Sequence, residues 1–112
     1  MFVLKNKQVE TFKKIEREKF IYKSLVFLKY NYPDWVKGKK DDDLGQFVEQ
    51  MMDFSEKHHI RKEINIQKVM NLQIQYGFEI PLPKYLEDFI KPQQKTEDTR
   101  IKNFYKVLFE NK

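Results

Sequence analysis

The chain has 112 residues, with 22 Lys and Arg against 17 Asp and Glu, a net charge of +5 and an aromatic content of 15%. This length predicts one domain, residues 1–112, that buries roughly two thirds of the surface of its unfolded chain. Such a domain folds without disulfides or other covalent cross-links. The absence of cysteine excludes disulfides, thiolate nucleophiles and cysteine-bound zinc. Basic and acidic residues alternate along most of the chain, which is typical of a soluble surface.

The N-terminal residues Met1–Lys5 contain too short an apolar run for a signal peptide. No later run of apolar residues approaches the length that is needed to cross a bilayer. We therefore expect a cytoplasmic protein that does not associate with membranes.

The first predicted element is a long amphipathic helix from Gln8 to Asn31, which Pro33 ends because proline lacks an amide hydrogen and disfavours helical geometry at the residue before it. Its apolar positions recur at helical spacing: Val9, Phe12, Ile15, Phe20, Ile21, Leu25, Phe27 and Leu28. Residues 34–40 are predicted to form a loop. The triplet Asp41–Asp43 is interpreted as the start of a second helix that runs to about Lys57, because carboxylates stabilise a helix N-terminus.

The third predicted helix follows a turn at residues 58–62 and is ended by Gly77, which supplies a left-handed residue. Its apolar positions surround almost the whole helical wheel, which is typical of a helix covered on several sides. These positions are Ile64, Ile66, Val69, Met70, Leu72, Ile74 and Tyr76. Residues 78–83 are predicted to be extended, because Pro81 and Pro83 forbid continuation of the helix.

A short fourth helix is predicted at residues 85–90, ended by Pro92, and a polar linker at residues 93–96 leads to a last helix from about Glu97 to Phe109. The core face of the last helix is predicted to contain Ile101, Phe104, Tyr105 and Leu108. The sequence therefore predicts an all-α fold, a compact bundle of about five helices without strands. In this bundle the long N-terminal helix packs on the third helix, which is central and buried.

Residue types that could perform chemistry are sparse and badly spaced. His58 and His59 are the only imidazoles, and neighbouring residues on a helix point about 100° apart, so the pair cannot chelate one metal ion. Neither Ser24 nor Ser55 lies in a GxSxG context, and the three glycines are too isolated to cradle a phosphate. We predict no catalytic residue, no metal and no cofactor, and hence a protein that is not an enzyme.

Nucleic-acid binding is the alternative that the composition favours most. The first helix and the following loop contain many basic residues: Lys13, Lys14, Arg17, Lys19, Lys23, Lys37, Lys39 and Lys40. Acidic residues interrupt them, so no continuous cationic stripe is predicted. The aromatic residues among these charges, Phe20, Tyr22, Phe27 and Tyr30, fall at core spacing and are interpreted as buried rings that cannot stack on bases.

Three large rings lie in loops or beside them. Trp35, Phe78 and Tyr85 are each either a plug over the end of the bundle or an anchor for a protein partner. We predict these three as the partner-binding residues.

The pattern as a whole resembles small all-helical bacterial proteins that are encoded in gene clusters for type VI secretion and other polymorphic toxins. The resemblance spans nearly the whole chain and rests on helix ends and core positions: Phe20, Phe27, Leu28, Tyr32-Pro33, Phe47-Val48, His58-His59-Ile60, Glu63, Tyr76-Gly77, residues 78–90, Arg100 and Ile101. The chain departs from this pattern at His59, where glycine is usual, and at Tyr85, where tryptophan is often found.

The resemblance implies a non-enzymatic immunity or accessory (adaptor or chaperone) protein that binds a bacterial secreted toxin or effector. The basic charge suits an acidic partner. The alternatives are a small basic nucleic-acid-binding protein, regulatory or phage-borne, and a purely structural homodimer formed through the first or the last helix.

Overall fold

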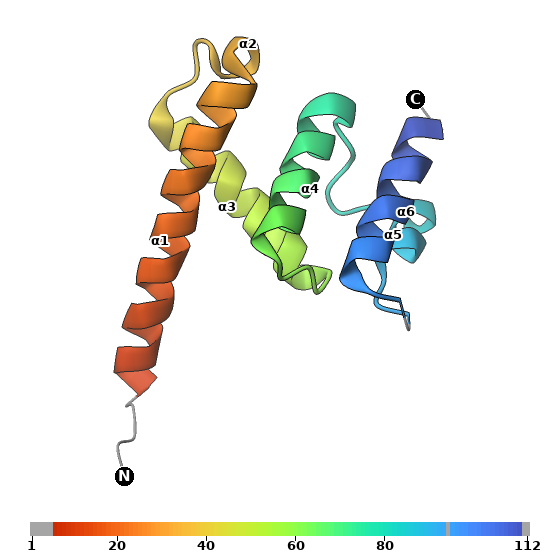
Figure 1. Ribbon diagram of the computed structural model, residues 1–112, viewed down its shortest axis with the longest axis horizontal. Helices are drawn as coiled ribbons and strands as arrows, with labels where there is room; N and C mark the ends of the chain where they lie inside the picture. The colour runs from red at the N-terminus through yellow and green to blue at the C-terminus, as the bar shows by residue number, and fades with distance from the viewer. Residues whose placement is uncertain (1–5, 94, 111–112) are drawn as a thin grey trace. The chain divides into compact units, whose positions relative to one another are not determined.

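Figure 1 shows a computed structural model of the protein, which describes residues 6–93 and 95–110, with side chains from residue 13 onward. The described residues form six helices and no strand: α1 (Asn6–Asn31), α2 (Pro33–Val36), α3 (Asp41–Lys57), α4 (Glu63–Tyr76), α5 (Lys84–Ile90) and α6 (Glu97–Glu110). The predicted all-α class and the five predicted helices are confirmed. The predictions for Met1–Lys5, for the Val9 and Phe12 side chains and for Gln94 in the linker lie outside the described residues.

The sixth helix is the short α2, where the sequence predicted a loop. Pro33 occupies its first position, where a missing amide hydrogen costs nothing and the fixed φ angle suits a helix. The Val36 amide donates to the Tyr32 carbonyl over 3.0 Å, which closes the single turn. Gly38, with φ of 83°, then turns the chain toward α3.

The chain divides into two compact units, residues 1–48 and residues 49–112, with the boundary inside α3. In the first unit, α1 has two apolar sides. Phe20, Ser24 and Leu28 are buried at four-residue spacing, whereas Tyr22 and Tyr30 are 70% and 85% exposed on the opposite side. Ile15, predicted for the core, and Val26 lie on this exposed side as well, so the prediction that the α1 tyrosines are buried rings is wrong.

The hydrogen bonds at the start of α3 confirm the interpretation of the acidic triplet Asp41–Asp43 as the start of a capped helix. The Asp43 carboxylate accepts the Lys40 amide over 3.2 Å, and the Lys40 carbonyl accepts the first helical amide, that of Leu44. Asp41 in addition forms an ion pair of 2.8 Å with Lys29 of α1.

The second unit has its core where α6 packs against α4 and α5. The Phe78 ring lies at its centre, with ring centroids 5.3 Å from both Phe54 of α3 and Phe104 of α6. Val69, Met70 and Leu72 of α4 are buried, but Ile64 is 56% exposed, so the prediction of a helix covered almost all round is wrong at its first turn. Gly77 ends α4 in the left-handed conformation, as predicted, with φ of 59°.

Among the described residues, no helix combines the length and the apolar character that are required to cross a membrane.

Candidate functional site

The N-terminus of α4 is capped by a residue that is far away in the sequence. Lys62, the residue before the helix, supplies no side-chain cap. The Glu97 carboxylate of α6 takes this role and accepts the Arg61 amide over 2.7 Å, the Lys62 amide over 3.0 Å and the Asn65 side-chain amide over 2.6 Å. A negative charge at this position also interacts favourably with the helix dipole.

These contacts change the titration of the two carboxylates at the start of α6. Partial burial alone would raise the pKa of Glu97, but the hydrogen bonds from Arg61, Asn65 and Lys62 outweigh it and lower this pKa below its ordinary value. The neighbouring Asp98 accepts hydrogen bonds from Asn65 over 2.8 Å and from the Lys62 ammonium over 3.3 Å, and they lower its pKa as well. Both carboxylates therefore stay ionised to a lower pH than the same groups in the unfolded chain.

Arg100, one turn further along α6, is 4% exposed and binds the ends of two other helices. Its Nη1 donates to the carbonyls of His58 and Ile90 over 2.9 and 2.8 Å, and its Nη2 donates to the His59 carbonyl over 3.0 Å. Carbonyls at helix C-termini have no partner within their own helix and carry partial negative charge, which suits a guanidinium group. Arg100 thus fastens the ends of α3 and α5 to α6.

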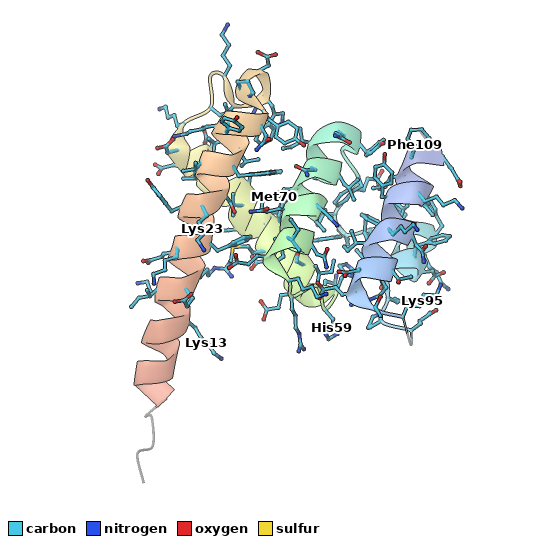
Figure 2. All side chains as sticks on the ribbon, viewed as in Figure 1. Lys13, Lys23, His59, Met70, Lys95 and Phe109 are labelled. Carbon is cyan, nitrogen blue, oxygen red and sulfur yellow. The ribbon has the colours of Figure 1, made fainter. Side chains whose placement is uncertain are left out.

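The turn after α3 has the geometry of a Schellman motif. The Ile60 amide donates to the Ser55 carbonyl over 2.8 Å and the His59 amide to the Glu56 carbonyl over 3.1 Å. His59 has φ of 58°, the left-handed conformation that favours glycine, and lies in the turn between α3 and α4 (Figure 2). His58 is buried, with its ring centroid 4.6 Å from that of Phe54, and burial lowers its pKa, with a further lowering from Lys57.

A groove with a volume of about 580 Å³ lies between α4 and α6. Helix α4 lines it with Lys68, Asn71, Leu72 and Gln75, and α6 lines it with Asp98, Ile101, Lys102 and Tyr105. Its floor is apolar because Leu72 and Ile101 are each 3% exposed, while its rims are polar and aromatic. This combination of an apolar floor and polar rims is that of grooves that bind peptide segments.

Aromatic rings cluster at one end of this groove. The Tyr105 ring stacks on the Phe109 ring, with centroids 6.2 Å apart, and meets the Tyr76 ring edge-on at 6.4 Å. Tyr105 is 46% and Phe109 58% exposed, and Figure 2 shows Phe109 near the C-terminal end of α6. Exposed rings of this kind are frequent anchors of protein interfaces.

A second hollow, of about 400 Å³, lies beside the chain segment that joins α4 to α5. It is lined by Gln75, Tyr76, Gly77, Phe78, Glu79, Pro83, Tyr85, Leu86 and Leu108, so Gln75 borders both hollows. Tyr85 is 57% exposed at its rim, and Phe89, one turn along α5, is 44% exposed.

The three residues predicted to bind a partner lie in different settings. Phe78 is 6% exposed and fills the core of the second unit, so its ring is not available on the surface. Trp35 is half-buried in the first unit, with its ring 4.8 Å from Phe47 and the Lys39 ammonium 4.4 Å from its ring centroid. Of the three, Tyr85 alone presents a largely exposed ring, and it belongs to the second unit, whereas Trp35 belongs to the first.

The α4–α6 groove was not found from the sequence. The predicted core face of α6 contained Tyr105, but this residue lies on the rim of the groove, whereas Phe104 is fully buried. The available signal was the spacing of Asp98, Lys102, Tyr105 and Phe109, which places them on one side of α6.

Within the described ranges, no three His, Asp or Glu residues lie close enough together to hold a metal ion. No protein-family model, curated protein or solved structure matches this chain.

Proposed function

We propose that this protein is a non-enzymatic protein-binding module, an immunity or accessory (adaptor or chaperone) protein that binds a bacterial secreted toxin or effector in the cytoplasm. The observation that supports a binding role most directly is the α4–α6 groove, with its apolar floor and the exposed Tyr105 and Phe109 rings at one end. The sequence resemblance supports the class of partner.

The proposal is tested by mixing the purified protein with the purified products of the genes next to its own. We expect one of these products to co-elute with it in size-exclusion chromatography, and toxicity of that product in bacteria to fall when the two are made together if the role is immunity. Separate elution of every product would contradict the proposal.

One observation favours the alternative of nucleic-acid binding. The exposed Tyr22 and Tyr30 rings on α1 are accompanied by exposed lysines, among them Lys19 and Lys23. Stacking rings next to cations are what single-stranded nucleic acid requires. Affinity for labelled single-stranded DNA or RNA that falls steeply with added salt and is lost in the Tyr22→Ala/Tyr30→Ala variant would support this alternative.

A further inference from the structure

The two walls of the α4–α6 groove have matching spacing. Lys68, Asn71 and Gln75 lie three and four residues apart on α4, and Asp98, Lys102 and Tyr105 lie four and three apart on α6. The helices run parallel, because Asn65 contacts Asp98 at their starts and Tyr76 contacts Tyr105 near their ends. At 1.5 Å per residue, the lining from Lys68 to Gln75, like that from Asp98 to Tyr105, corresponds to a groove about 10 Å long, or two turns of a bound helix.

Apolar side chains lie on the floor of the groove and beyond both of its ends. Leu72 and Ile101 form the floor. Ile64, which is 56% exposed, precedes Lys68 by one turn on the same side of α4, and Phe109 follows Tyr105 by one turn on α6. A segment that lay in the groove and extended one turn past each end would therefore meet apolar side chains in the middle and at both ends.

The charges on the walls are not balanced. The Asp98 carboxylate is occupied by the Lys62 ammonium and the Asn65 side chain. In the part of the chain that the structure describes, neither Lys68 nor Lys102 has a carboxylate within ion-pair distance. Lys68 is near enough to Asp98 to help lower the pKa of this carboxylate, but it forms no ion pair with it. The groove thus contains two ammonium groups, one on each wall, against a single carboxylate that already pairs with Lys62.

We infer that this groove binds an acidic amphipathic segment of the protein partner, with apolar side chains on the floor between Leu72 and Ile101 and carboxylates paired with Lys68 and Lys102. The inference rests on the proposed protein-binding function and adds to it the location and the chemistry of the contact. A bound helix suits the site, because residues three and four apart on such a helix would match the spacing of both walls.

The test uses the full chain and two fluorescein-labelled helical peptides of 14 residues. Both peptides have leucines along one side, which glutamates flank in one peptide and lysines in the other. We expect fluorescence anisotropy to show binding of the acidic peptide and at least tenfold weaker binding of the basic one. Amide chemical shifts should move around Leu72, Ile101 and Tyr105 when the acidic peptide is added.

Charge reversal tests the two lysines directly. Lys68→Glu/Lys102→Glu should weaken binding of the acidic peptide at least tenfold, and Lys68→Gln/Lys102→Gln, which adds no repulsion, should weaken it less. The matched control Lys84→Glu/Lys95→Glu changes the net charge equally at two exposed lysines outside the groove, Lys95 being visible in Figure 2, and should change the affinity less than twofold.

Three outcomes would overturn the inference: no binding of the acidic peptide, equal loss in the groove and control variants, or shifts confined to other helices. If the groove variant instead abolished self-association in light scattering or binding of duplex DNA while the peptide stayed bound, the occupant would be a second copy or DNA, and the inference would also be wrong. A toxin complex that survives Lys68→Glu/Lys102→Glu would refute the inference and leave the proposed function standing. Binding of the acidic peptide without any toxin complex would refute the proposed function and leave the groove's preference for an acidic segment standing.

Discussion

Replacing Arg100 with methionine should destabilise the second unit strongly. The substitution keeps a long apolar stem but removes three hydrogen bonds, and it leaves the carbonyls of His58, His59 and Ile90 without their donor. A hydrogen bond to a charged group contributes about 1.5–3 kcal/mol. Removal of the guanidinium also removes the cost of keeping a charge away from water, so we expect a net loss of about 3–5 kcal/mol in the free energy of unfolding.

The measurement is urea unfolding followed by circular dichroism at pH 7. With a dependence on urea of about 1.5 kcal/mol per molar, the midpoint should fall by about 2–3 M. Lys102→Met on the same helix is the matched control, because its side chain is exposed and the substitution should alter the free energy of unfolding by less than about 0.5 kcal/mol. A loss below about 1 kcal/mol for Arg100→Met would refute the assignment of Arg100 as the residue that fastens α3 and α5 to α6.

Substitutions at three further positions test the contacts around α4. Glu97→Gln should lower the free energy of unfolding at pH 7 by about 1–2 kcal/mol, because an amide nitrogen replaces one of the two accepting oxygens. Since the pKa of Glu97 is lowered in the folded protein, its stabilisation is present above the ordinary glutamate pKa and is lost as pH falls through the lowered value, so the variant should lose less stability than the parent below pH 4.5. The pKa of His58 is lowered in the folded protein, so protonation of His58 favours the unfolded chain and the free energy of unfolding should fall as pH drops below 6.5. In a pH series of thermal melts, His58→Phe should reduce this fall in melting temperature. An unchanged fall would contradict the assignment of buried His58 as its cause. His59→Gly should raise the melting temperature by a few degrees because it relieves a left-handed φ, whereas His59→Val should lower it; equal effects of the two would contradict the strain.

The positions of the helices could be predicted because the residues that end them act locally. Pro33, Gly77 and Pro92 remove an amide hydrogen or supply a left-handed residue, and these properties do not depend on the rest of the fold. The rule that proline ends a helix also led to the wrong prediction of a loop where the structure has α2. Pro33 ends one helix, but it also begins the next, and a single helical turn carries no periodicity that could reveal it.

The contacts of the second unit could not be predicted in this way. Asn65 and Glu97 lie 32 residues apart, and Arg100 lies 42 residues from His58. Spacing within a helix shows which residues share a side, but it does not show which distant polar group will pair with them. For the same reason Tyr105 was assigned to the core: its position on the apolar side of α6 is clear from the sequence, whereas the width of the space between α4 and α6 is not.

The dependence of three helices on α6 also constrains the order in which the second unit can be completed. Glu97 caps α4, and Arg100 holds the ends of α3 and α5, yet α6 follows all three in the chain. During synthesis, which proceeds from the N-terminus, the amides and carbonyls at these helix ends therefore lack their α6 partners until α6 itself has been made. Of the four helices α3 to α6, the one that comes last in the chain is the one that supplies the end contacts of the other three.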